Sequence, residues 1–128
     1  MNAPVARLAN KTALVTGASR GIGAAIATRL AREGAHVVLV SRKQPALDEV
    51  ADQIRSLGAQ ATPLACHIGD VDAVEDLVER VIDELGPVSI LVNNAATNPY
   101  FGPMMNLEWP AWDKTFEVNL KGYFAMTR

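Results

Sequence analysis

Short apolar runs alternate along this chain with longer segments whose apolar residues recur at helical spacing. No other feature restricts the possible folds so strongly. Apolar runs without polar alternation predict strands that are covered on both faces, as in a parallel sheet. The predicted strands cover residues 13–15, 37–40, 60–66 and 88–92. The predicted helices cover residues 21–33, 45–57, 71–85 and 110–128. This order predicts a parallel sheet with helices on both of its faces.

The third predicted strand contains Pro63, which indicates its place in the sheet. Proline lacks the N–H that a central strand needs, so this strand should lie at an edge. The spatial order 3-2-1-4 satisfies that requirement and is typical of an α/β, Rossmann-like, doubly wound parallel sheet. Residues 1–128 are thus predicted to be the N-terminal part of a single Rossmann-like dinucleotide-binding domain, truncated in the fourth helix. Further strands are expected beyond the fourth.

Composition limits the classes of partner. The chain has 128 residues, 49% of them hydrophobic, and a formal net charge of −2 without a basic stripe, so no nucleic-acid partner is expected. Residues 85–107 carry no charge, but their prolines and asparagines argue against a membrane span. The N-terminus shows no signal peptide, and the single cysteine, Cys66, favours a reducing, cytoplasmic setting. No metal site is predicted.

A glycine-rich turn, residues 16–23, follows the first predicted strand. Gly17 would permit the tight turn, Gly21 would let the backbone approach a pyrophosphate, and Gly23 would allow close packing of helix on strand. Free N–H groups at the start of the helix would then face the phosphates of a dinucleotide. A plain glycine loop is the alternative. The predicted cofactor-binding residues of this turn are Gly17, Ser19, Arg20, Gly21, Ile22 and Gly23.

Ser41, Arg42 and Lys43 stand where the second predicted strand ends. An acidic residue at that place usually holds the ribose hydroxyl of NAD. A hydroxyl and guanidinium groups, including that of Arg20, would instead bind a 2′-phosphate, and arginine suits bidentate contact with it. We therefore expect NADP(H) in preference to NAD(H). Alternatively, Arg42 and Lys43 are a solvated pair of charges.

Three asparagines are further candidates. Asn93 and Asn94 follow the fourth predicted strand at its carboxyl end, where ligands bind in a doubly wound sheet, although turn-forming asparagines are the alternative. Asn119 shares a helix face with aromatic residues, so the spacing predicts a buried amide that needs hydrogen-bond partners. From spacing alone, a structural role for Asn119 is favoured. The aromatic neighbours on this face are Trp112, Phe116 and Tyr123. Trp109 and Trp112 are expected in the core or an interface.

These motifs together resemble the short-chain dehydrogenases/reductases. Residues 16–23 match the family's T-G-x-x-x-G-I-G, and residues 93–96 resemble its N-N-A-G with alanine in the last place. The resemblance implies that Asn93, Asn94 and Ala95 contact the cofactor or the central sheet. It also implies that Asn119 is catalytic, as the asparagine of the Asn-Ser-Tyr-Lys tetrad, holding a water and the lysine in a proton relay.

The stretches 66–69 and 98–101 resemble the branch of NADPH-dependent carbonyl and retinal reductases. Many family members have an aspartate that touches adenine where this chain has His67, followed by Ile68. His67 could stack on the base, form a hydrogen bond to it, or remain a solvated rim residue. Tyr100 and Phe101 are expected near the cleft and could shape a substrate pocket.

Family chemistry is hydride transfer between nicotinamide and a small-molecule carbonyl or alcohol substrate, with a serine, a tyrosine and a lysine at the reacting centre. The family's Tyr-x-x-x-Lys is absent here, since Met104 and Thr127 stand four residues after Tyr100 and Tyr123. The chain alone is thus expected to be inactive. The resemblance also implies that the complete protein is a dimer or a tetramer, and a homotetramer is expected. A nucleotide-binding or regulatory module without catalysis is one alternative, and an unrelated structural α/β domain is another.

Overall fold

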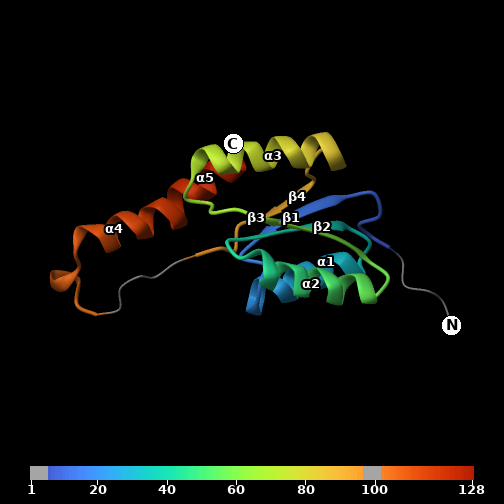
Figure 1. Ribbon diagram of the computed structural model, residues 1–128, viewed down its shortest axis with the longest axis horizontal. Helices are drawn as coiled ribbons and strands as arrows, with labels where there is room; N and C mark the ends of the chain where they lie inside the picture. The colour runs from blue at the N-terminus through green and yellow to red at the C-terminus, as the bar shows by residue number, and fades with distance from the viewer. Residues whose placement is uncertain (1–5, 97–101) are drawn as a thin grey trace.

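The computed structural model describes residues 6–96 and 102–128, and these form a four-stranded parallel sheet with the order β3-β2-β1-β4 (Figure 1). The strands are β1 Thr12–Thr16, β2 His36–Ser41, β3 Gln60–Ala65 and β4 Ile90–Val92. The fold class and the strand order are those predicted from the sequence. Tyr100 and Phe101, the expected pocket residues, lie outside the described residues.

Strand pairing explains why the two outer strands differ from the inner ones. Pro63 lies on β3, opposite Leu39 of β2. β3 is at the edge of the sheet, as the missing N–H of the proline requires. β4 is shorter than predicted, because residues 88 and 89 are not part of the ladder, although the Ser89 N–H donates to the Thr12 carbonyl oxygen at 2.9 Å. β1, paired on both sides, therefore places its carboxyl end at the centre of the sheet.

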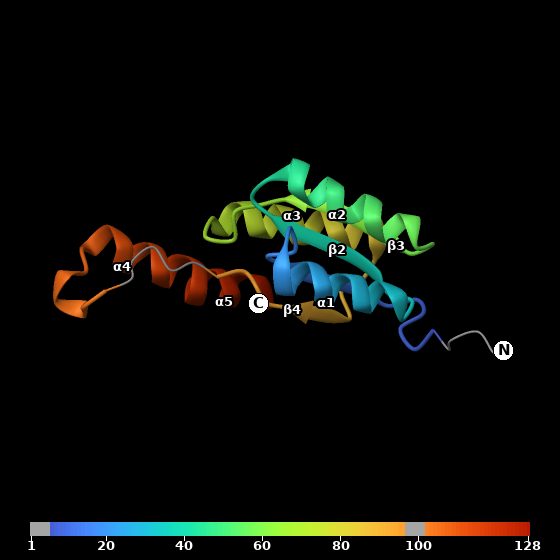
Figure 2. The same cartoon turned by 90° about the horizontal axis from the view of Figure 1, so that it is seen from below.

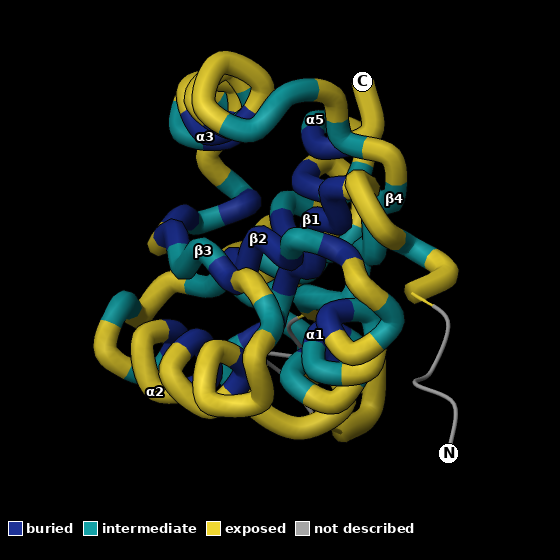
Figure 3. The backbone as a smooth tube through the Cα atoms, turned by 90° about the vertical axis from the view of Figure 1, so that its right-hand side faces the viewer, coloured by how far each residue is buried: buried dark blue, intermediate teal, exposed yellow. Residues whose placement is uncertain are grey.

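Helices cover both faces of the sheet (Figures 1 and 2). α1 Gly21–Arg32 and α2 Gln44–Ser56 lie on one side, and α3 Val71–Leu85 and α5 Tyr123–Thr127 lie on the other. Successive strand residues point to opposite faces, so Val37 and Leu39 pack with the first pair of helices, whereas Val38 and Val40 pack with the second. Burial accordingly concentrates in the strands and on the inner helix faces (Figure 3).

The last helical segment is not the uniform α-helix that was predicted. It begins with α4 Trp109–Phe116, widens into the π-helical segment η2 Glu117–Gly122 and ends as α5, and a short 3₁₀ turn, η1 Met104–Asn106, precedes it. α4 extends away from the sheet and its helices (Figures 1 and 2). π-helical insertions often occur at functional sites. No helix among the described residues is long and apolar enough to cross a membrane.

The aromatic side of this segment faces solvent, so Trp109 and Trp112 are not in the core, the first of their two expected places. Trp109 is 75% exposed, and Trp112 and Phe116 are also exposed, with their rings 4.7 Å apart. The opposite side packs inward through its small and aliphatic residues, which are Val118, Gly122 and Met126. The predicted common face holds for Trp112 and Phe116, but Tyr123 packs against the core and Asn119 is only half-buried.

His36, at the start of β2, should make folding depend on pH. Its Nε2 lies 2.7 Å from Thr62 Oγ1, and burial together with the charge of Arg55 lowers the pKa of His36 below its ordinary value of 6.5. The unfolded chain therefore binds the proton more readily, so stability is complete above pH 6.5 and declines as the pH falls toward the folded-state pKa. Urea unfolding at pH 7.5 and pH 5.5 should show a smaller decline in His36→Gln than in the parent chain. Equal declines would contradict this role.

Candidate functional site

The turn between β1 and α1 leaves the positive end of a helix open. Gly17 and Gly21 have φ values of +64° and +58°, a backbone region that favours glycine. Arg20, at the N-cap of α1, makes no side-chain hydrogen bond to the helix, and the first turn contains no acidic residue. A Cβ added at Gly21 would meet nothing within 4 Å, so the backbone there borders open space. Free N–H groups and the helix dipole can thus receive an anion.

Thr16 joins this turn to the residues after β4. Its fully buried hydroxyl accepts hydrogen bonds from the N–H groups of Asn94 and Ala95, each at 3.0 Å. The same hydroxyl donates to the Val92 carbonyl oxygen at 3.3 Å. Asn94 Nδ2 also donates to the Gly17 carbonyl oxygen at 3.3 Å. The two loops are therefore held together at the carboxyl ends of β1 and β4.

Gly23 is required by the same close packing. A Cβ at this position would lie far inside contact distance of the Gly17 carbonyl oxygen and 2.6 Å from Asn94 Nδ2. A Cβ at Gly17 would lie 2.9 Å from the Ala95 Cα atom. Gly17 and Gly23 thus let the turn, the start of α1 and the loop after β4 pack closely, while Gly21 leaves the ligand side of the turn open.

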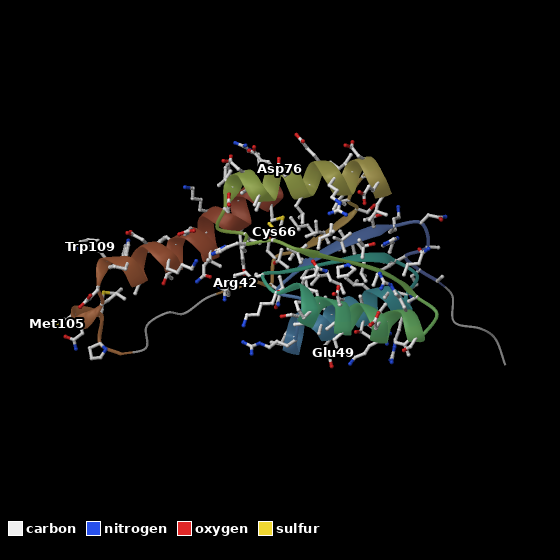
Figure 4. All side chains as sticks on the ribbon, in the orientation of Figure 1. Arg42, Glu49, Cys66, Asp76, Met105 and Trp109 are labelled. Atoms are coloured by element: carbon white, nitrogen blue, oxygen red, sulfur yellow. The ribbon has the colours of Figure 1, made fainter. Side chains whose placement is uncertain are left out.

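A cleft of about 390 Å³ opens beside these loops, at the carboxyl ends of the strands. In a doubly wound sheet this is where ligands bind. Its walls come from the turn after β1, the ends of β2 and β3, the loop after β4, and the last helical segment. Figure 4 shows Arg42 and Cys66 near this end of the sheet, whereas Glu49 and Asp76 lie on the outer helices.

Every side chain lining the cleft that is charged at neutral pH is basic. The three cations are Arg20, Arg42 and Lys114, and no aspartate or glutamate lines the described walls. The uncharged polar groups include the hydroxyls of Ser19 and Ser41. Burial, and to a lesser degree the charge of Asp70, raises the pKa of the Cys66 thiol, which therefore stays neutral. The cleft is thus built for an anionic ligand.

Most of the predicted cofactor-binding residues come together in this cleft, but several do not. Those lining it are Gly17, Ser19, Arg20, Gly21, Ser41, Arg42, His67, Ile68, Asn94 and Ala95. Those outside its lining are Ile22, Gly23, Lys43 and Asn93, and Asn119, which was predicted to be catalytic, does not line it either.

Asn93 points toward the last helical segment. Its Nδ2 donates to Thr127 Oγ1 at 3.3 Å, and its buried Oδ1 has no hydrogen-bond partner in the described part of the chain. Asn119 lies in η2, the π-helical segment, away from the cleft lining. Of the two adjacent asparagines, Asn94 therefore lines the cleft, whereas Asn93 contacts the last helical segment.

Sequence reasoning assigned no site role to Thr16, Lys114 or Val118. A threonine closing an otherwise apolar strand was a usable signal for Thr16, since a buried hydroxyl needs partners. Lys114 and Val118 stand four residues apart, on α4 and η2, and both line the cleft. Their spacing showed a common helix face, but not that this face would meet the cleft.

His67 and Lys114 touch at the rim of the cleft. Lys114 Nζ lies 2.6 Å from His67 Nε2, and the N–H of Gly69 donates to His67 Nδ1 at 3.0 Å. The contact joins the loop after β3 to α4, between residues whose numbers differ by 47. His67 is therefore held by its own loop on one side of the ring and meets a lysine on the other.

Known proteins are similar to this chain in sequence and in fold. A family model described as short chain dehydrogenase matches residues 11–128. Dehydrogenase/reductase SDR family member 4 of Homo sapiens is 46% identical over 121 residues, which are 94% of this chain and 44% of that protein. This chain thus spans less than half the length of that curated relative.

Solved structures superpose closely on the fold. One is a metagenomic short-chain oxidoreductase in complex with NADP, with a TM-score of 0.92 and 38% identity, covering 95% of this chain and 55% of that one. Another is a citronellol catabolism dehydrogenase of Pseudomonas aeruginosa, with a TM-score of 0.91 and 34% identity, covering 98% of this chain and 51% of that one.

The packing around Gly23 gives a direct test of the site's construction. Gly23→Ala should lower the free energy of unfolding by about 3 kcal/mol or more, because the new methyl group meets backbone that cannot move aside. Gly58→Ala is the matched control, since its methyl group enters open space and only its φ of +82° is strained. That control should lose roughly 1–2 kcal/mol. Chemical unfolding of both variants would measure the difference, and equal losses would refute the packing role.

Proposed function

Because this chain belongs to the short-chain dehydrogenase family, we propose that it is the cofactor-binding part of an oxidoreductase that transfers hydride between NADP(H) and a carbonyl or alcohol substrate. The observation that carries the cofactor assignment is the charge of the cleft, whose lining includes Arg20, Arg42 and Lys114 and no carboxylate among the described residues. A 2′-phosphate adds charge that such a lining attracts. The relative solved with NADP supports the same cofactor.

The residues of the turn would hold the pyrophosphate. N–H groups at the start of α1 face the cleft near Gly21, and the helix dipole adds attraction for negative charge. Ser41 and Arg42 follow β2, where the ribose is expected, so a hydroxyl and a guanidinium would meet the 2′-phosphate. Asn94, held by Gly17 and Thr16, fixes the wall beside β4.

The chemistry of the proposed reaction needs groups of two kinds. The nicotinamide would supply or accept the hydride, while a proton donor must serve the substrate oxygen. Asn119 is proposed to take part in the proton relay as a positioning residue, and its place in a π-helical segment supports a functional role. An alcohol or carbonyl substrate is supported by the dehydrogenase of citronellol catabolism, since citronellol is an alcohol.

Self-association is part of the proposal. Five large apolar side chains are exposed along the last helical segment: Trp109, Trp112, Phe116, Leu120 and Phe124. An exposed apolar stripe of this size is typical of a surface that contacts another protein. A dimer or tetramer that covers this stripe is the assembly we propose for the complete enzyme.

Reversing the charge of Arg42 tests the cofactor assignment. Arg42→Asp should weaken NADP⁺ binding by about 30-fold or more, since it removes a charge-assisted contact and adds repulsion, and should change NAD⁺ binding less than about threefold. Isothermal titration calorimetry would measure both constants. Arg32→Asp is the matched control, because it makes the same charge change at the far end of α1. Equal losses for both cofactors in Arg42→Asp would contradict a role at the 2′-phosphate.

The division between binding and chemistry can also be tested. The purified 128-residue chain, with an intact mass of 13.7 kDa, should bind NADPH but not oxidise it with carbonyl compounds, because it lacks a Tyr-x-x-x-Lys. Fluorescence titration and a spectrophotometric assay would measure the two properties. A longer protein that carries this chain should oxidise NADPH. Binding without turnover in the longer protein would favour a regulatory module, and no binding would favour a structural domain.

A further inference from the structure

The side chain of Gln44, at the start of α2, is bound to β3. Its Nε2 donates to the Pro63 carbonyl oxygen at 3.1 Å, and its Oε1 accepts from the Ala65 N–H at 3.0 Å. The same nitrogen donates to Asp48 Oδ1 at 2.8 Å. Since a carbonyl oxygen and a carboxylate accept and a backbone N–H donates, these three partners fix which end of the amide faces which group.

The two bonds to β3 lie on the open edge of the sheet. The Cys66 N–H donates to the Ser41 carbonyl oxygen of β2, so the polar groups of Pro63 and Ala65 point to the other side of β3. In a parallel ladder, a residue donates to a carbonyl of the neighbouring strand and accepts from an N–H two residues further along it. The amide of Gln44 does both, as a further strand would.

This side chain closes the loop between β2 and α2 at its far end. Ser41 holds the near end, through its bond to Cys66, and Gln44 holds the far end on the same strand, β3. Arg42 lies between them, lines the cleft, and forms no ion pair within the part of the chain that the structure describes. The backbone of this short loop therefore determines where the guanidinium of Arg42 lies. Gln44 itself does not line the cleft.

We propose that Gln44 is a positioning residue for the 2′-phosphate of NADP(H). By occupying the open edge of β3 in place of a strand, it fixes the loop that presents Arg42 to the cofactor. A charge-assisted contact between a guanidinium and a phosphate depends on this geometry. NAD(H) has no 2′-phosphate, so its binding depends less on the loop. This inference rests on the proposed function, because it assumes that NADP(H) occupies the cleft.

Gln44→Met tests the inference, because methionine has a similar length but cannot form the three hydrogen bonds. Isothermal titration calorimetry of the full chain should show NADP⁺ binding weakened about tenfold and NAD⁺ binding changed less than about threefold. Gln44→Asn is a second variant, which keeps the amide on a side chain too short to reach β3. It should shift the ratio of the two dissociation constants in the same direction.

Gln53→Met is the matched control. It makes the same replacement at an exposed position of α2, so both dissociation constants should stay those of the parent chain. Circular dichroism would establish that each variant is folded.

A double-mutant cycle tests whether Gln44 acts through Arg42. In the Arg42→Ala background, adding Gln44→Met should change NADP⁺ binding less than about twofold, because the group that it positions is gone. A merely structural role would not depend on Arg42 in this way.

An unchanged ratio of the two dissociation constants in Gln44→Met and Gln44→Asn would overturn the inference. Equal losses for NADP⁺ and NAD⁺, or a full further loss in the Arg42→Ala background, would also overturn it. In each case normal NADP⁺ binding by the parent chain would leave the proposed function intact. Failure of the parent chain to bind either NADP⁺ or NAD⁺ would instead overturn the proposed function, and this inference with it.

Discussion

The buried hydroxyl of Thr16 holds the candidate site together. It accepts from two consecutive N–H groups after β4 and donates to the last residue of β4, so one side chain of β1 binds three backbone groups at the end of the neighbouring strand. Leaving buried N–H groups without an acceptor costs about 1–3 kcal/mol each. The spacing between β1 and β4 is therefore tightly determined, and Gly17 and Gly23 are needed because nothing larger than hydrogen fits in the remaining space.

This tight spacing separates structural and ligand-binding roles within one turn. Gly23 faces the protein, where a methyl group would collide with backbone, whereas Gly21 faces open space beside the helix terminus. Ala18 contributes to the first role, since its N–H donates to the Val40 carbonyl oxygen at 3.2 Å and ties the turn to β2. The outer part of the turn is thus fixed from three strands while its N–H groups stay available to an anion.

The fold could be predicted because its main constraints are local. A proline without an N–H restricted β3 to an edge, and uninterrupted apolar runs indicated parallel strands. The orientation of the last helical segment could not be predicted in this way. Spacing placed Trp112 and Phe116 on one face, but either face of such a helix could meet the core. Val118, Gly122 and Met126 meet it here, and the contact between His67 and Lys114 depends on that choice.

Glycines also determine how the last helical segment approaches the cleft. A Cβ on Gly122 would lie 2.8 Å from the Ile68 carbonyl oxygen, so a side chain there would push η2 away from the loop after β3. Gly69, on that loop, makes room for Glu117 in the same manner. Two glycines on facing elements thus let a helix and a loop pack at backbone distance. That packing brings Val118 and Ile68 together and Lys114 against His67, so the two glycines shape this part of the cleft although they have no side chains of their own.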